Sequence, residues 1–138
     1  MRPATFEESD AFRIVPGADV FELRRLRMLD GLPVAVDRSV VPLARAPRLP
    51  DVDFATASLY ETLEAAGSRP ARADYVVAAR TVEPREARLL DVERGAAVLV
   101  AGTRAYDAGD ALLEIAATVY RGDRYRFHAS LWRGTWGP

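Results

Sequence analysis

The chain has 138 residues, a length that fits one domain with its own core and leaves no room for two. Nineteen basic residues, all of them arginine, balance twenty acidic ones to a net charge of -1, so the cationic excess typical of a nucleic-acid-binding domain is missing. The content of 49% hydrophobic and 28% charged residues is that of a globular protein. The sequence has no cysteine, which excludes disulfides and thiolate chemistry, and no apolar run of about 20 residues, which excludes a membrane span. Because a signal peptide is also missing, we expect a cytoplasmic protein.

The first half of the chain predicts a hairpin that is preceded and followed by short or irregular segments. We expect a leading strand over residues 5–8 and a helical turn over residues 9–14, which Pro16 and Gly17 end. The hairpin consists of strands over residues 20–29 and 33–41, joined at the turn signal Asp30-Gly31. Residues 43–54 carry two prolines and little periodicity, which predicts a loop with at most a helical turn.

The second half predicts two helices and a second hairpin. Ser58 and Glu61 match a capping box, so a helix should begin there and end in a left-handed cap at Gly67. A strand is expected over residues 75–79 and a second helix over residues 84–90, with proline at its first position. Residues 98–107 and 111–120 form the second hairpin around Ala108-Gly109, and residues 125–132 read as a last strand.

The two hairpins match each other at a constant offset of 78 residues. Gly17-Ala18 precedes the first strand of one hairpin as Gly95-Ala96 precedes that of the other. Two copies of a hairpin do not make a solenoid. They indicate a pseudo-symmetric α+β domain, in which both hairpins share one antiparallel sheet and the helices pack on a face of it.

The first hairpin places two arginines on a largely apolar strand face. Arg25 and Arg27 point the same way because strand side chains alternate between faces. A three-residue turn with Gly31 in the bulge position would pair Arg25 with Ala35 and leave Asp37 diagonal to Arg25. The three charges could cradle a phosphate or carboxylate, or they could form a salt bridge that needs no ligand.

The second hairpin carries a glutamate in a similar setting. The same turn geometry places Glu114 opposite Gly102 and diagonal to Arg104, with Tyr120 on the same face as Glu114. Glu114 could therefore meet a ligand, or it could pair with Arg104. Ser58 at a helix start could bind an anion, although simple capping is the commoner reason for serine there.

Motifs of catalysis and of metal binding are missing. The single histidine, His128, follows Phe127 in a strand-like segment and is interpreted as structural. The sequence holds no nucleophile elbow, no glycine-rich phosphate loop with lysine and no zinc signature. We expect no catalytic residues, no metal and no cofactor.

Three motifs together resemble the UTRA effector-binding domain of HutC-type GntR transcriptional regulators. They are Leu-Arg-Arg-Leu-Arg-Met-Leu-Asp-Gly-Leu-Pro-Val-Ala-Val-Asp-Arg-Ser at residues 23–39, Ser-Leu-Tyr-Glu-Thr-Leu at 58–63 and Tyr-Arg-Gly-Asp-Arg-Tyr-Arg-Phe at 120–127. The resemblance runs from about residue 5 to residue 131. It implies a chorismate-lyase-like fold, an antiparallel sheet with flanking helices and an effector pocket between them.

The resemblance also implies roles for particular residues. In members that sense sugar phosphates, an Arg-x-Arg pair and the serine of the helix start hold the phosphate, and carboxylates and a tyrosine complete the pocket. Asp37 stands where the family commonly has glutamate, which weakens the assignment to a sugar. The ligand-binding residues implied here are Arg25, Arg27, Asp37, Ser58, Glu114 and Tyr120.

The function implied is that of a sensor without catalytic activity. The domain would bind a small anionic metabolite, with a sugar phosphate favoured. It would relay the presence of this ligand to a winged helix-turn-helix half that these 138 residues lack. DNA would be bound only through that half. A homodimer is expected, through the sheet edge or the last strand, where Trp132 and Trp136 lie. The alternatives are a chorismate-lyase-like enzyme that eliminates pyruvate with help from Glu114, and a degenerate dimerisation domain.

Overall fold

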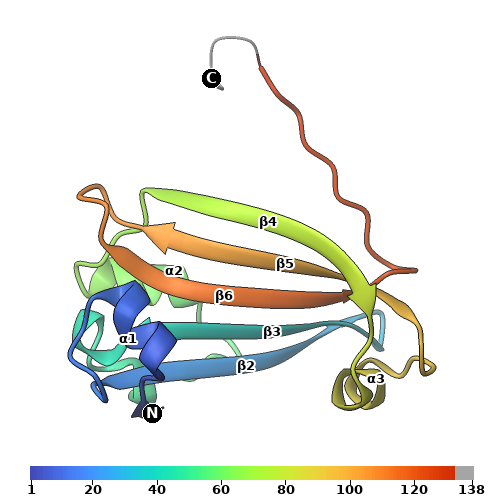
Figure 1. The fold of residues 1–138 in the computed structure, drawn as a ribbon, viewed down its shortest axis with the longest axis horizontal. Coiled ribbons are helices and arrows are strands. Elements are labelled where there is room, and N and C mark those ends of the chain that lie inside the picture. Colours follow the sequence, from blue (N-terminus) through green and yellow to red (C-terminus); the bar gives the residue numbers. More distant parts are fainter. Residues whose placement is uncertain (133–138) are drawn as a thin grey trace.

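The computed structural model describes residues 1–132 and is built around one six-stranded antiparallel sheet, in the strand order β1-β2-β3-β6-β5-β4 (Figure 1). The sheet confirms the predicted α+β architecture. The strands and helices are β1 (Arg2–Pro3), α1 (Phe6–Phe12), β2 (Asp19–Leu29), β3 (Leu32–Pro42), the 3₁₀ turns η1 (Leu43–Arg45) and η2 (Leu49–Asp51), α2 (Leu59–Ala65), β4 (Arg72–Thr81), α3 (Pro84–Leu90), β5 (Ala97–Tyr106) and β6 (Leu112–Arg121).

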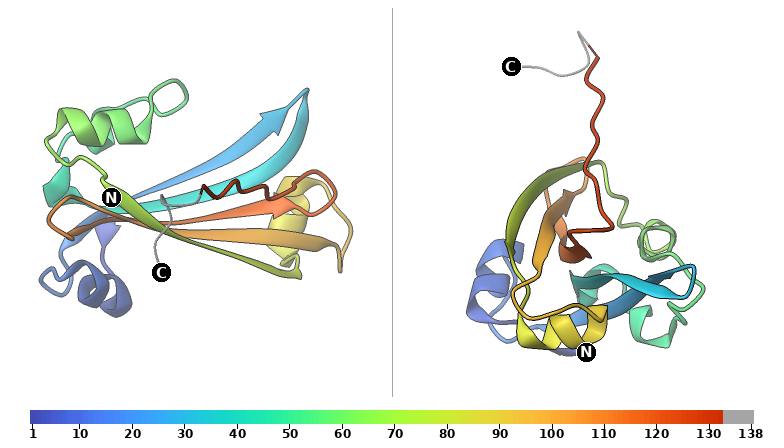
Figure 2. Two further views of the ribbon diagram at one scale, coloured as in Figure 1. Left: turned by 90° about the horizontal axis from the view of Figure 1, so that it is seen from above. Right: turned by 90° about the vertical axis from the view of Figure 1, so that its right-hand side faces the viewer.

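The helices lie on both faces of the sheet rather than on one. Figure 2 shows α1 and α2 on opposite sides of the strands. We call the two faces the α2 face and the α1–α3 face. On the α2 face, Leu59 and Leu63 of α2 pack into a buried cluster with Val41, Leu49 and Phe54. The burial of these side chains fixes α2 against one end of the sheet.

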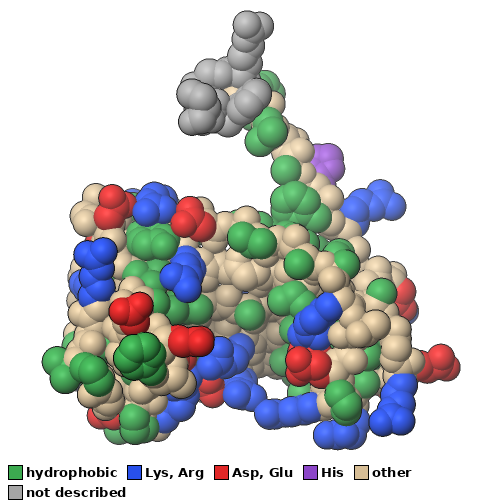
Figure 3. Space-filling view, viewed as in Figure 1, with side chains coloured by type: hydrophobic (Ala, Val, Ile, Leu, Met, Phe, Trp, Pro, Cys, Tyr) green, Lys and Arg blue, Asp and Glu red, His purple; other side chains and the backbone are tan. Residues whose placement is uncertain are grey.

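Two smaller clusters hold the helices of the α1–α3 face. Phe12 of α1 packs against Val20 and Val40, and Leu90 of α3 packs against Val98. The two clusters lie toward opposite ends of the sheet, so the strand surface between the two helices is left to solvent (Figure 3). None of the helices in the described part of the chain is long and apolar enough to cross a membrane.

The leading strand predicted over residues 5–8 is wrong, because Thr5 caps a helix. The Thr5 hydroxyl accepts from the Glu8 N–H, and the Glu8 carboxylate accepts from the Thr5 N–H, which completes a capping box. Helix α1 therefore begins at Phe6, three residues before the predicted helical turn. In the chain before α1, only the two residues of β1 form a strand of the sheet.

The internal repeat extends beyond the hairpins. The offset of 78 residues places α1 exactly on α3, and it carries the Arg2–Glu8 ion pair onto the Arg80–Glu86 ion pair. Arg13, which ends α1 in the left-handed region, matches Asp91 at the end of α3. The two halves are thus copies of one helix-and-hairpin unit.

The centre of the sheet relates these two copies by an approximate two-fold axis. In the pairing of β3 with β6, Arg38 lies opposite Ala117 and Ser39 lies opposite Ala116. The same offset maps Arg38 onto Ala116 and Ser39 onto Ala117, so exchanging the copies reproduces the pairing. Because the copies carry different side chains, only one of them supplies arginines to the α2 face.

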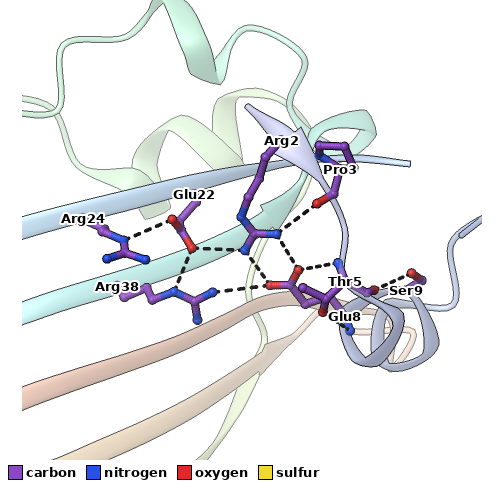
Figure 4. A network of polar contacts seen from close by, with 8 residues as sticks. All are labelled: Arg2, Pro3, Thr5, Glu8, Ser9, Glu22, Arg24 and Arg38. Carbon is purple, nitrogen blue, oxygen red and sulfur yellow. Dashed lines mark hydrogen bonds and ion pairs between the residues drawn. The ribbon is translucent and has the colours of Figure 1, made fainter. Parts of the chain in front are cut away.

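A polar network attaches β1 and α1 to the sheet (Figure 4). The Arg2 guanidinium donates to both oxygens of Glu8, at 2.7 and 2.8 Å, and to Glu22 of β2 at 3.1 Å. Arg38 of β3 donates to Glu22 at 2.8 Å. The paired Arg2 lowers the pKa of the buried Glu8 carboxyl to about 2, so this network is charged at neutral pH.

The registers of both hairpins differ from the predicted ones. Asp30 and Gly31 both have positive φ, 51° and 77°, which makes a two-residue turn instead of a three-residue one. Arg25 consequently lies directly opposite Asp37, where a diagonal placement was expected. A bulge between Arg27 and the next residue supplies the remaining shift.

The last strand predicted over residues 125–132 is wrong, since these residues belong to no strand and project away from the sheet (Figure 1). The alternation of residue types was read correctly as extended chain, but a strand needs a neighbour to pair with. His128 lies on this segment, is exposed and has its Nε2 3.4 Å from the Ser130 hydroxyl. Trp136 lies outside the described residues.

Candidate functional site

A cavity of about 410 Å³ opens on the α2 face, between the sheet and the first turn of α2. Strands β2, β3, β5 and β6 form its floor and α2 closes one side. Its walls are lined by Arg25, Arg27, Asp37, Ser39, Ser58, Leu59, Tyr60, Thr103, Glu114, Ala116 and Thr118.

A pair of arginines from β2 meets a buried aspartate from β3 in the cavity. The Arg27 Nε donates to one oxygen of Asp37, and the Thr118 hydroxyl donates to the other at 2.8 Å. The Asp37 residue is 4% exposed, whereas the Arg27 side chain is 55% exposed. Asp37 is therefore satisfied by the protein itself, while the outer part of Arg27 is open to solvent.

Arg25 differs from Arg27 because it has no hydrogen-bond or ion-pair partner among residues 1–132. Its Nε is the one side-chain nitrogen or oxygen of the described residues that is buried and makes no hydrogen bond. Arg25 also forms no ion pair among the described residues, although it lies opposite Asp37 in the ladder. A buried donor without an acceptor is costly, which favours an anion at this position.

The opposite end of the cavity holds a buried carboxylate, Glu114, which is 3% exposed. The Tyr60 hydroxyl donates to the Glu114 Oε1 at 2.8 Å and so joins α2 to β6. Burial, together with the adjacent Glu114 carboxylate, raises the pKa of the Tyr60 hydroxyl well above its usual value. Tyr60 remains protonated and can donate throughout the physiological range.

The register of the second hairpin decides the partner of Glu114. Glu114 lies opposite Ala105 rather than the predicted Gly102. Arg104 lies opposite Ile115, on the other face of the sheet, so the predicted alternative of a Glu114–Arg104 ion pair is wrong. The space in front of Glu114 is bounded instead by the first turn of α2.

Ser58 reaches the cavity as the N-cap of α2. Its hydroxyl accepts from the Glu61 N–H at 3.4 Å, as the capping pattern predicted. Helix α2 has seven residues, so its dipole is short. The capping role is thus established, and any contact with a ligand would be additional to it.

Tyr120 lies on the same face as Glu114 but is not among the residues that line the cavity. Its ring stacks on Tyr125, with the ring centroids 3.8 Å apart and the planes at 11°. Burial and the neighbouring Tyr125 raise the pKa of the Tyr120 hydroxyl. The structure thus brings five of the six predicted residues into one cavity and places Tyr120 beside them.

Six of the eleven residues that line the cavity were not predicted from the sequence, and two of these six, Tyr60 and Thr118, donate hydrogen bonds to its carboxylates. Thr118 shares its face with Glu114 and Tyr120 because all three are separated by even numbers of residues on one strand, a signal that could have found it. Tyr60 lies two residues after the helix cap Ser58, but its contact with Glu114 spans 54 residues of sequence. No local pattern indicates that contact.

A second cavity, of about 430 Å³, lies on the α1–α3 face between the two helices. Its floor is apolar and includes Val36, Val100 and Val119, and Arg24, Arg38, Arg80 and Arg85 surround it. Basic side chains are visible along the lower margin of this face in Figure 3. In residues 1–132, no three acidic or histidine side chains gather as a metal site would require.

Comparisons with known proteins find relatives in sequence and in fold. The transcriptional repressor NagR of Bacillus subtilis (strain 168) is 31% identical over 111 residues, 80% of this chain and 45% of NagR. The repressor PhnF of Mycolicibacterium smegmatis is 30% identical over 113 residues, 82% of this chain and 46% of PhnF. The crystal structure of the effector domain of PhnF from Mycobacterium smegmatis superposes with a TM-score of 0.88 at 27% identity, over 94% of this chain and 80% of that one.

This chain spans less than half the length of either repressor. The family model of the UTRA domain matches residues 1–126, which include every residue that lines the cavity on the α2 face. The chain belongs to the UTRA domain family.

Proposed function

We propose that residues 1–138 form the effector-binding domain of a bacterial GntR-type regulator of the HutC class, and that the cavity on the α2 face binds a small anionic metabolite. Arg25 and Arg27 hold the anionic group, and Ser58 adds a hydroxyl at the start of α2. Glu114 accepts a hydrogen bond from a hydroxyl or N–H group of the same ligand. A sugar phosphate meets both requirements.

The observation that carries this proposal is the unpaired Arg25 Nε, which is buried at the cavity wall. A structural salt bridge would have placed an acceptor there, and Asp37, which lies directly opposite Arg25 in the ladder, is already held by Arg27 and Thr118. A bound phosphate or carboxylate would supply the missing acceptor.

The regulator acts as a symmetric dimer, and DNA is bound through a separate winged helix-turn-helix half. NagR and PhnF are both HTH-type transcriptional repressors, and the match covers less than half of each. The effector can shift DNA binding only if it has different affinities for two arrangements of the dimer.

A thermal-shift screen of the purified domain against phosphorylated sugars tests this proposal, with inorganic phosphate, sulfate and chorismate as controls. A ligand at a hundred times its dissociation constant stabilises the fold by about 2.7 kcal/mol, which is roughly 9 °C for 138 residues. A shift by one sugar phosphate that Arg25→Met abolishes supports the proposal. A shift only with an uncharged or apolar compound would overturn it.

A further inference from the structure

The cavity of about 430 Å³ on the α1–α3 face has an apolar floor and apolar sides. Val36, Val100 and Val119 form the floor. Leu26 of β2 and Leu89 of α3 also line the cavity, and they are 43% and 38% exposed. Sites for small molecules have volumes of about 300–1,000 Å³ and are lined mainly by apolar side chains with a few polar groups. The size and the lining of this cavity therefore suit the apolar part of a small molecule.

The sheet separates this cavity from the one on the α2 face. Leu26 and Val36 lie opposite each other on β2 and β3, and Val36 packs against the cluster of Leu90 under α3. Arg25 and Asp37, their neighbours in the sequence, turn their side chains into the cavity on the α2 face, because strand side chains alternate between faces. The two cavities thus share strands but present different side chains to a ligand.

The α1 end of the cavity carries more positive than negative charge. Three guanidiniums, those of Arg2, Arg24 and Arg38, share the carboxylates of Glu8 and Glu22 (Figure 4). Glu22 alone accepts from all three arginines, at 3.1, 3.1 and 2.8 Å. Two carboxylates cannot neutralise three guanidiniums, so this network keeps one positive charge in excess.

The α3 end supplies an arginine whose side chain has no partner. Arg80 is satisfied, because it donates to both oxygens of Glu86 at 2.8 Å. Arg85 also lines the cavity, but its side chain forms no hydrogen bond or ion pair with any other side chain of residues 1–132. Glu83 and Glu86 balance the charges of the two arginines at this end. The excess of one positive charge around the whole cavity therefore matches a monovalent anion.

We propose that the cavity on the α1–α3 face is a second ligand site, which binds a carboxylate carried on an unbranched hydrocarbon chain. The hydrocarbon chain lies on the valine floor, and the carboxylate accepts hydrogen bonds from Arg85 at the rim. A sugar phosphate is a poor ligand here, because its hydroxyl groups would be buried against valine side chains without hydrogen-bond partners. The site is thus distinct from the effector site in its position and in its class of ligand.

Calorimetric titration of the full chain with decanoate, octanoate and acetate, below the concentrations at which micelles form, tests the proposal. We expect one decanoate per chain. Burial of each methylene group strengthens binding about fourfold, so decanoate should bind roughly tenfold more tightly than octanoate, and acetate should not bind measurably. Decyltrimethylammonium carries the same hydrocarbon chain with the opposite charge, and it should bind at least about tenfold more weakly than decanoate.

Two variants test the rim and the floor separately. Arg85→Glu should weaken decanoate binding by about tenfold or more, because it reverses the charge that faces the carboxylate. Arg88→Glu is the matched control: it makes the same change of charge at an exposed position of the same helix that does not line the cavity, and affinity should be unchanged. Leu26→Glu places a carboxylate beside the floor and should also weaken binding. Both replaced side chains are exposed, and urea unfolding checks that the variants fold.

Several results would overturn the proposal. They are no binding of decanoate at millimolar concentration, equal affinity for decyltrimethylammonium, and equal losses in Arg85→Glu and Arg88→Glu. Binding that Arg25→Met abolishes and Leu26→Glu leaves unchanged would place decanoate in the cavity on the α2 face instead. If no decanoate binds and Leu26→Glu halves the mass measured by light scattering, a second copy of the chain covers this face. The effector screen uses sugar phosphates and a variant of the other cavity, so the two proposals fail separately.

Discussion

Replacing Arg25 with methionine should move stability and ligand binding in opposite directions. Methionine keeps most of the apolar stem of the arginine and removes the guanidinium. The Arg25 Nε is buried without an acceptor, and Arg25 makes no ion pair among the described residues, so the unliganded protein loses no interaction. Leaving a buried donor unsatisfied costs about 1–3 kcal/mol. We therefore expect Arg25→Met to leave the free energy of unfolding unchanged or to raise it by about 1 kcal/mol.

The same substitution should weaken anion binding. A hydrogen bond to a charged group contributes about 1.5–3 kcal/mol, which corresponds to roughly ten- to a hundredfold in affinity. Arg27→Met is the informative comparison, because Arg27 holds the buried Asp37. Since the Arg27 side chain is 55% exposed, we expect a loss of only about 1–2 kcal/mol of stability in addition to weaker binding.

Urea unfolding of the unliganded proteins and calorimetric titration with the anion found in the thermal-shift screen measure the two effects. We expect Arg25→Met to weaken anion binding without lowering the free energy of unfolding, and Arg27→Met to lower both. If Arg25→Met destabilised the unliganded domain by more than about 2 kcal/mol, Arg25 would be a structural residue with a partner in solution. An unchanged affinity would remove Arg25 from the binding site.

Four further outcomes are expected. The pKa of Glu8 is about 2 in the folded protein, against an ordinary value of 4.5, so ionised Glu8 contributes on the order of 3 kcal/mol to the free energy of unfolding. This contribution is complete above pH 4.5 and is lost as the pH falls toward 2. In urea unfolding at a series of pH values, Glu8→Gln should flatten that part of the stability profile. Tyr60→Phe leaves the buried Glu114 without its donor and should cost about 1–3 kcal/mol in the same assay, and an unchanged midpoint would mean that water replaces the hydroxyl. Leu63→Ala, at a fully buried position of α2, should cost about 2–5 kcal/mol, and a smaller loss would show that α2 packs loosely. Incubation with chorismate should release no pyruvate, and turnover that Glu114→Ala abolishes would refute a purely regulatory role.

The elements that were predicted correctly depend on local signals. Ser58 caps α2 through its own hydroxyl, and Pro84 begins α3 at the position that tolerates proline. Both hairpins, and their relation by 78 residues, follow from turn residues and apolar alternation within about 25 residues of chain. The capping box at Thr5 was equally local, and the leading strand was predicted wrongly because that signal was overlooked.

Only part of the candidate site could be predicted from the sequence. Period-two alternation was sufficient to place Arg25 and Arg27 on one face of their strand, and Glu114 and Tyr120 on one face of theirs. It was not sufficient to pair Arg25 with Asp37, because one residue more or less in the turn shifts the register. The resemblance to the UTRA family supplied the grouping of residues that alternation could not.

Sequence alone determined the two hairpins, the helix caps and the faces of the strands, because each of these is set by residues within a few positions of one another. The tertiary structure decided the partner of Glu114, the isolation of Arg25 and the departure of residues 126–132 from the sheet. Each of those features depends on segments that are tens of residues apart in the sequence. Their free energies are set by how deeply the side chains are buried and by whether a hydrogen-bond partner lies within reach. Burial and unmet hydrogen bonds are properties of the packed molecule, and no local pattern of residues specifies them.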